Sequence, residues 1–265
     1  MEKTKQLIRE RHEITLARLA DAHCHLYELD RSAITAARMA GVRIMITNGV
    51  DTRTNARTLE MYGQDGIYCM VGVHPNSAIT IEEDELEFNV KLIKANAKKI
   101  VGIGEIGLDY LSAKDDVQKG KQKRALTSML DLAAGLRKPV SLHSRGSIKD
   151  VFKMLESYPE LPVHMHFFEG SAEDARLAQK RGYYISVPYL KSAQRAEAVR
   201  AMELSNIMVE SDSPTANSTP SDVLNAVQLV SELKGIEKNK VAEQTFENTK
   251  RLFNIDATRF MRSGL

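Results

Sequence analysis

Six side chains that could bind a metal or move a proton stand at, or just past, the ends of short apolar runs, and Asp212 does the same near the end of the chain. Imidazole nitrogens and carboxylate oxygens are common ligands of divalent cations. Parallel strands that alternate with helices bring their ends to one rim of a fold. The spacing therefore predicts a divalent-metal site on that rim. The six are His23, His25, His74, Glu105, His143 and His166.

The first of these groups is the His23-Cys24-His25 triplet, which follows Asp21 and Ala22. Side chains two apart on a strand share a face, so both imidazoles can project to the same side and chelate one cation. An isolated pair of this kind can also be structural. Its position at the end of the first apolar run favours a metal ligand pair.

Glu105 lies in an apolar, glycine-rich segment that runs from Gly102 to Tyr110. A buried carboxylate is costly unless a cation compensates it. Glu105 could bridge two metals, and the alternative is an ion pair with a nearby arginine. Asp109 and Tyr110 are expected further out on a loop, where they would either orient ligands or substrate or simply pack.

His143 and His166 end the fifth and sixth apolar runs. A single histidine in such a run is more often a core residue than a ligand, but two at the ends of successive strands favour metal binding. His164 shares a face with His166 and is expected one layer deeper, in the core or behind the ligands. Arg145, just after His143, is assigned to substrate binding.

Asp212 follows the eighth run and would face His23 and His25 where a barrel closes. It could ligate a metal and accept the proton of the attacking water. Glu210 is expected behind the ligands or in contact with substrate. His74 has no partner in the sequence and is predicted to contact substrate or phosphate.

Eight strand-like runs alternate with segments of helical periodicity, which predicts an α/β fold, a (β/α)₈ TIM barrel in one domain. An open doubly wound sheet is the alternative, but it would not draw ligands from so many strand ends. The predicted strands are 16–22, 43–47, 67–73, 100–104, 139–142, 162–166, 183–187 and 206–210. The clearest helices are 32–40, 83–98, 121–134, 172–180 and 221–233, with Gly41, Gly135 and Gly182 at or after their ends.

Length and composition suit this architecture. The chain has 265 residues, and one such barrel needs about 250. We expect the barrel over 16–265 and an extra N-terminal helical extension over 1–15, which either packs under the barrel or forms a loose tail. A net charge of +2 permits an anionic partner without implying one.

Cysteine usage and the lack of targeting signals indicate a cytoplasmic protein. Cys24 and Cys69 do not form a disulfide framework. The charged N-terminus does not resemble a secretory signal, and no apolar stretch reaches membrane-spanning length, so no membrane partner is expected. The sequence leaves the oligomeric state open.

Taken together, the segments between Asp21 and Phe253 resemble the TatD family of metal-dependent hydrolases and deoxyribonucleases, within the amidohydrolase superfamily. The resemblance implies a barrel with two divalent metals, zinc, manganese or magnesium, and hydrolysis of phosphodiester bonds in DNA. It assigns His23, His25 and Asp212 to one metal and His143 and His166 to the other. Glu105 would bridge the two and, with Asp212, be catalytic. The motifs are DAHCHL, VGVHP, GEIGLDY, PVSLHSR, HFFEG, VESDSP and ENTKRLF.

Two departures from the family pattern leave the substrate open. His166 is followed by Phe-Phe-Glu-Gly where small residues are usual, and the loop 215–220 carries no cation to hold a phosphate. An ester, lactone or amide hydrolase acting on a small molecule or an aminoacyl ester is the alternative, and a non-catalytic scaffold is another. A basic cluster after the fourth run could steer a phosphate backbone or could be a solvated helix start. It comprises Lys114, Lys119, Lys121, Lys123 and Arg124.

Overall fold

The eight strands pair in parallel and in sequence order, which confirms the predicted (β/α)₈ barrel and not a doubly wound sheet with a switch in strand order. The computed structural model describes residues 18–255. The predicted extension over 1–15 lies outside that range. The strands are β1 (Leu19–Cys24), β2 (Val42–Asn48), β3 (Ile67–Val71), β4 (Ile100–Asp109), β5 (Val140–Arg145), β6 (Val163–Met165), β7 (Tyr184–Val187) and β8 (Ile207–Val209).

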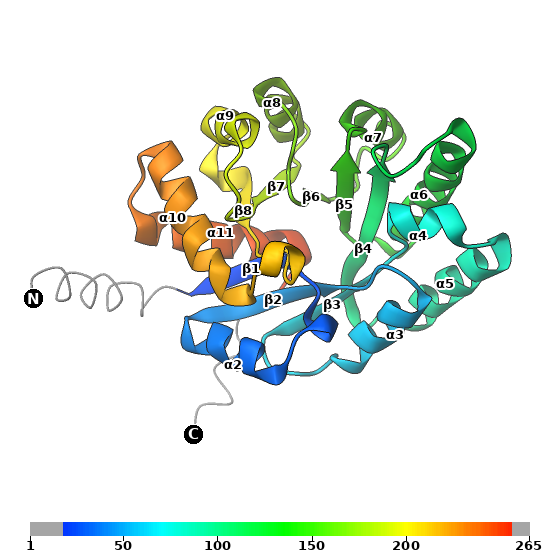
Figure 1. Ribbon diagram of the computed structural model, residues 1–265, viewed down its shortest axis with the longest axis horizontal. Helices are drawn as coiled ribbons and strands as arrows, with labels where there is room; N and C mark the ends of the chain where they lie inside the picture. The colour runs from blue at the N-terminus through cyan, green and yellow to red at the C-terminus, as the bar shows by residue number, and fades with distance from the viewer. Residues whose placement is uncertain (1–17, 256–265) are drawn as a thin grey trace, which may run out of the picture.

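Helices follow the strands along the chain and surround the sheet (Figure 1). None of those described is long and apolar enough to cross a membrane. The α-helices are α2 (Arg31–Met39), α3 (Thr52–Glu60), α4 (Pro75–Thr80), α5 (Glu83–Ala95), α6 (Asp116–Leu136), α7 (Ile148–Leu155), α8 (Ala172–Lys180), α9 (Ala193–Ala201), α10 (Val223–Lys234) and α11 (Lys238–Phe253). Short 3₁₀ turns are η1 (Leu26–Glu28), η2 (Leu204–Asn206), η3 (Thr215–Asn217) and η4 (Pro220–Asp222).

The seam between β8 and β1 is closed without a strand ladder in the part of the chain that is described. The Asp212 N–H donates to the His23 carbonyl at 3.0 Å. Below it, the carboxylate of Asp21 accepts from the Ser211 N–H at 2.9 Å and from its hydroxyl at 2.5 Å. These bonds tie the chain after β8 to β1 and so fix Asp212 beside the first histidines.

Two apolar cores stabilise the barrel. The larger core lies between the sheet and the helices, where valine, isoleucine and leucine dominate. The smaller core fills part of the barrel interior and takes aromatic side chains from α11. It includes Ala20, Ala22, Ile44, Ile46, Met70, Met208, Phe246, Leu252 and Phe253. Burial of these side chains leaves the opposite end of the interior for polar groups.

Most predicted strands agree with the structure to within a few residues, and three expectations are corrected. Strand β1 begins at Leu19 and runs past the expected end at residue 22. Strand β4 continues to Asp109, so Asp109 is not on a loop. Helix α6 passes through Gly135 and ends at Leu136. Its C-cap residue, Arg137, has the left-handed backbone (φ 52°) that glycine more often supplies at this position.

Candidate metal centre

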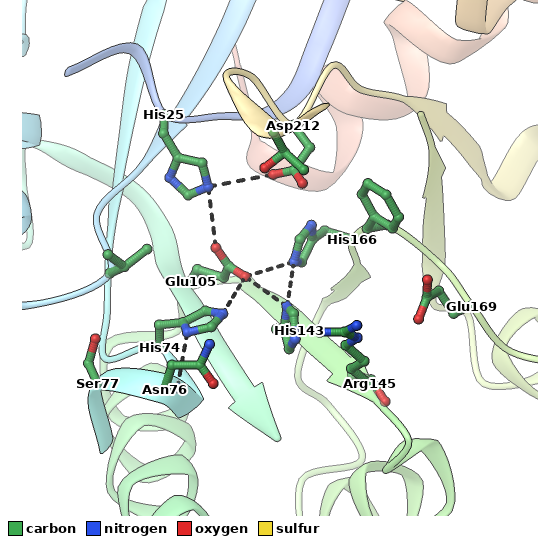
Figure 2. Close-up of a pocket in the computed structure, with 14 residues that line it drawn as sticks. His25, His74, Asn76, Ser77, Glu105, His143, Arg145, His166, Glu169 and Asp212 are labelled. Atoms are coloured by element: carbon green, nitrogen blue, oxygen red, sulfur yellow. Dashed lines mark hydrogen bonds and ion pairs between the residues drawn. The ribbon is translucent and has the colours of Figure 1, made fainter. Parts of the chain in front are cut away.

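The predicted rim forms a pocket of about 590 Å³ at the carboxyl ends of the strands. Figure 2 shows the imidazoles of His25, His74, His143 and His166 turned toward the carboxylate of Glu105. The lining residues come from the ends of several strands, as the barrel architecture requires. They are His25, Val50, His74, Asn76, Ser77, Glu105, His143, Ser144, Arg145, His166, Phe167, Glu169, Asp212 and Thr215.

A register shift in β1 points both histidines of the first motif into the barrel. Pairing with β2 is irregular between Asp21 and Cys24. Ala22 packs in the barrel interior, whereas Cys24 packs in the outer core. A bulge changes which face each later side chain occupies. His23 and His25 thereby meet over the centre with their ring centroids 5.1 Å apart.

A second register shift, between Ile103 and Ile106, positions Glu105 within β4. Both isoleucines pack in the outer core although they are three residues apart, which strict alternation forbids. The shift allows this arrangement and turns the Glu105 carboxylate inward. Glu105 was expected at a strand end, and instead the strand continues past it. Gly104 is required here because a Cβ would lie 2.8 Å from the Cβ of Ser141.

The two oxygens of Glu105 face two different sets of imidazoles. Oε2 lies 3.3 Å from His23 Nε2 and 3.5 Å from His25 Nε2. On the other side, Oε1 lies 2.8 Å from His166 Nε2 and 3.1 Å from His143 Nδ1. A carboxylate that presents one oxygen to each of two nitrogen sets has the arrangement of a bridging metal ligand.

Asp212 completes the first set from the β8 end. Its Oδ1 lies 3.5 Å from His25 Nε2 and 3.8 Å from His23 Nε2. Three potential ligand groups of histidine and carboxylate atoms surround the centre in the described chain: His23, His25 and Asp212; His74, Glu105 and His143; and His23, His166 and Glu210.

The second nitrogens of His23, His25 and His143 each face an acceptor outside the centre. His25 Nδ1 lies 2.8 Å from the Asn48 carbonyl, and His23 Nδ1 lies 3.2 Å from the Ser141 hydroxyl. His143 Nε2 is 3.5 Å from Asp109 Oδ2. Metal-binding histidines usually donate their other N–H to such a group.

The buried His23 Nε2 has no hydrogen-bond partner. A buried nitrogen without a partner is costly unless something binds its lone pair. The donor set therefore fits divalent cations, which imidazole and carboxylate both bind.

The electrostatics of the centre keep the carboxylates of Glu105 and Asp212 ionised. Burial opposes ionisation of Glu105, but the imidazoles of His166 and His74 outweigh it and hold the Glu105 pKa well below its ordinary range. Burial also opposes protonation of His25 and His143. Contacts with Asp212 and Glu105 raise the His25 pKa to about 9, and contacts with Asp109 and Glu105 raise the His143 pKa to about 9. Burial and the neighbouring His166 lower the His23 pKa to about 4.

Among the three residues assigned to substrate, the structure brings two into the pocket. His74, for which the sequence offered no partner, lies with its Nε2 3.2 Å from Glu105 Oε1. The Arg145 side chain lines the pocket and is 54% exposed. Tyr110 does not line the pocket, because its hydroxyl donates to Asp150 Oδ2 at 2.5 Å on the outer side of the barrel.

The loop after β6 forms a wall of the pocket through Phe167 and Glu169. Phe167 has a left-handed backbone (φ 45°), which is strained for a bulky residue. The guanidinium of Arg195 lies 4.7 Å from the Phe167 ring centroid and donates to the Phe168 carbonyl at 2.9 Å. Sequence reasoning did not find Arg195, which lies on α9, far from any motif.

Four of the five cations in the basic cluster after β4 lie beside carboxylates. Lys123 Nζ lies 2.7 Å from Asp150 Oδ2, and Lys121, Lys119 and Arg124 each lie 3.6 Å from a carboxylate oxygen. Paired surface cations attract a polyanion less than free ones do. The structure therefore favours a solvated helix face over a phosphate track.

Comparison with known proteins identifies relatives of this chain by sequence and by fold. The family model of TatD-related DNases matches residues 20–254. The metal-dependent hydrolase YabD of Bacillus subtilis is 32% identical, over 90% of this chain and 100% of its own length. Human deoxyribonuclease TATDN3 is 26% identical, over 89% of this chain and 94% of its own. The crystal structure of the TatD homologue YjjV from Escherichia coli has the same fold, with a TM-score of 0.83 at 24% identity, over 91% of this chain and 99% of that one.

Proposed function

The chain belongs to the family of TatD-related DNases and is a metal-dependent hydrolase, and from this premise we propose that it hydrolyses phosphodiester bonds in DNA with a two-metal centre. The observation that carries the proposal is the position of Glu105. Its two oxygens face separate imidazole sets, so a cation on each side would be bridged by one carboxylate.

In this proposal, His23, His25 and Asp212 hold one ion, His143 and His166 hold the other, and Glu105 is shared. Zinc, manganese and magnesium all suit imidazole and carboxylate ligands to differing degrees. When bound, such ions supply Lewis acidity and lower the pKa of a coordinated water.

The chain supplies the proton acceptor and the substrate contacts. Burial opposes ionisation of Asp212, but its hydrogen bond with His25 lowers the Asp212 pKa, so the group is ionised and has an oxygen on which a proton can be placed. The left-handed backbone of Asp212 (φ 48°) holds that carboxylate at the pocket wall. Arg145, with a planar guanidinium that suits phosphate oxygens, and His74 would bind the phosphate.

A second candidate function is hydrolysis of a carboxylic ester, including an aminoacyl ester. The observation that favours it is the charge at the pocket mouth. Glu169 lines that mouth with its side chain 46% exposed and only a long ion pair to Arg195, at 3.8 Å, so it could bind a substrate amino group and would not favour a polyanion. The 3₁₀ turn Thr215–Asn217 on the Asp212 loop carries no cation.

Assays of metal-loaded wild-type protein and of an Asp212→Asn variant, with DNA and with esters as substrates, distinguish the two candidate functions. We expect wild-type protein to cleave labelled single-stranded or duplex DNA, and the variant to be about 10²- to 10⁴-fold slower because its amide cannot accept the proton. Turnover of aminoacyl or neutral esters, with intact DNA and no inhibition by added DNA, would instead support the ester hydrolase. Elemental analysis is the companion measurement, since a chain that takes up no divalent metal would be a scaffold.

The cytoplasm remains our proposed location. Cys24 and Cys69 are both free thiols, as a reducing compartment would keep them.

A further inference from the structure

Beneath the proposed metal centre, a row of buried polar side chains crosses the barrel interior from β1 to β8. His23 Nδ1 lies 3.2 Å from Ser141 Oγ, which lies 3.1 Å from His164 Nδ1. On the far side, His164 Nε2 lies 2.6 Å from Ser186 Oγ, whose hydroxyl donates to Glu210 Oε2 at 2.6 Å. All five side chains are fully buried. Burying apolar side chains here would cost less free energy than burying polar ones, so the presence of this polar row requires an explanation.

Burial raises the pKa of Glu210 to about 7. When Glu210 is ionised it can only accept hydrogen bonds, and the direction of every bond in this row then follows from its carboxylate. Glu210 Oε1 accepts from the Phe167 N–H at 2.6 Å, and Oε2 accepts from Ser186. Since the Ser186 hydroxyl proton is used, its oxygen must accept from His164 Nε2–H. A neutral imidazole has one donor and one acceptor, so His164 Nδ1 must accept.

The remaining bonds then have only one arrangement. The Ser141 hydroxyl donates to His164 Nδ1, so its oxygen accepts from His23 Nδ1–H. The proton of His23 is therefore on Nδ1, and Nε2 carries the lone pair. That nitrogen faces Glu105 and has no hydrogen-bond partner in the described chain. The opposite direction would put the proton on Nε2 and block metal binding.

We propose that Ser141, His164 and Ser186 are positioning residues that connect Glu210 to His23 and hold His23 in the tautomer that ligates a metal. Glu210 also lies behind the second ligand set, with Oε2 3.9 Å from His166 Nδ1. That distance is too long for a hydrogen bond, so Glu210 acts on His166 through its charge alone, whereas it orients His23 through a relay of three side chains.

The relay is longer than the single hydrogen bond that usually orients a metal-binding histidine. His25 Nδ1 contacts the Asn48 carbonyl directly, which any residue at that position would supply, and the Tyr27 hydroxyl lies 3.3 Å from the same nitrogen. His23 instead depends on three side chains from β5, β6 and β7, and removing any one breaks the connection. The relay rests on the proposed metal centre but not on the identity of the substrate.

Zinc affinity and the His23 tautomer test the relay without reference to hydrolysis. His164→Leu removes both ring nitrogens, and we expect it to weaken zinc binding about 10- to 100-fold, the usual cost of losing a partner behind a ligand. His164→Gln retains one acceptor and one donor, and should bind zinc more tightly than His164→Leu. In zinc-free wild-type protein, long-range ¹H–¹⁵N spectra should show His23 protonated on Nδ1, with the signals assigned from a His23→Asn sample.

Asn248→Leu is the matched control. Asn248 is also fully buried and donates to the carbonyls of Leu204 and Ile207, but it has no contact with the relay. Its loss should lower the melting temperature and leave zinc affinity unchanged. The double variant Ser141→Ala/His164→Leu should bind zinc no more weakly than the weaker single variant, because one break already disconnects His23.

Three results would overturn the proposal: an Nε2–H tautomer of His23 in wild-type protein, wild-type zinc affinity in His164→Leu, or an equal loss of affinity in the control. If His164→Leu fails to fold, Ser186→Ala replaces it with a smaller disturbance and the same expected direction. Absence of DNA cleavage by wild-type protein with normal zinc binding would refute the proposed substrate and leave the relay intact.

Discussion

The candidate metal centre and the basic face of α6 both gather charged groups after strand ends, but those groups are paired in different ways. In the centre, five imidazoles converge on the buried carboxylate of Glu105, and the buried His23 Nε2 has no hydrogen-bond partner. On α6, exposed lysines and an arginine each lie beside a carboxylate. The centre has unused ligand atoms, whereas the helix face has already neutralised its charges.

This difference separates a binding site from a solvated surface. Buried polar atoms without partners carry a free-energy cost that a bound ion would remove. Exposed ion pairs contribute little and attract little. In a sequence, both regions look like clusters of ionisable residues, and only the packing distinguishes them.

The largest expected effect comes from Glu105→Gln, which removes the shared charge and keeps the side-chain volume. The imidazoles would lose the anion that holds them together, so we expect bound zinc to fall to one ion per chain or fewer. Hydrolysis should fall by at least about 10³-fold, because the electrostatic stabilisation at the reacting centre is lost. Elemental analysis and rate measurements check this, with circular dichroism to confirm the fold. Two bound ions in the variant would contradict the bridging role of Glu105.

The pH dependence of zinc affinity is the next largest effect. His25 and His143, with a pKa of about 9 in the metal-free protein, must each lose a proton before binding. Zinc affinity should therefore rise about tenfold per proton for each pH unit between 6.5 and 8.5. Calorimetry in buffers of different ionisation enthalpy would count the protons released, and a count of zero at pH 7 would contradict the expected charge state.

Stability of the metal-free protein should change in the opposite direction. The pKa of both histidines is raised on folding, so their contribution is fully present below pH 6.5 and is lost as pH rises to about 9. Denaturant unfolding of chelator-treated protein across this range would measure it. Increasing stability of the metal-free form toward pH 9 would be inconsistent with these pKa values.

The sequence predicted which residues converge better than it predicted how they are positioned. Run ends pointed to His25, His166 and Asp212 as ligand candidates, because parallel strands bring their carboxyl ends to one rim. The sequence alone could not predict the register shifts that turn His23 and Glu105 inward, because a bulge depends on pairing with a neighbouring strand.

Contacts between distant strands were also hidden from sequence reasoning. His164 was expected in the core or behind the ligands, and it lies there. Its bonds with Ser141 and Ser186 join three strands, and nothing local in the sequence indicates which serines face the same interior layer. Tyr110 was expected near the site because it directly follows β4, which carries Glu105. Its hydroxyl instead donates to Asp150, a contact that the sequence does not indicate.

Arg145→Met tests the cation at the pocket mouth and should have a moderate effect. The Arg145 side chain is 54% exposed, and its ion pair with Asp109 Oδ2 is long, at 4.0 Å, so a phosphate could still reach the guanidinium. We expect KM for DNA to rise about tenfold, the size of one charge-assisted contact, with zinc affinity unchanged. Unchanged KM for DNA would remove Arg145 from the substrate site, and the same variant assayed with a neutral ester gives the control.

Lys123→Met should have the smallest effect, and it is the most direct test of the comparison. Lys123 is the cation of α6 with the shortest ion pair, 2.7 Å from Asp150, and its ammonium lies 5.8 Å from the centre of the Tyr110 ring. A free steering cation would raise the association rate for DNA in a salt-dependent way, and its removal would lower that rate. Because the charge is already paired, we expect kcat/KM for DNA to change less than about twofold at low salt, and stability to change by about 0.2–1 kcal/mol. A severalfold fall in kcat/KM that disappears at high salt would mean that Lys123 attracts DNA despite its ion pair. The α6 face would then belong to the substrate site together with Arg145.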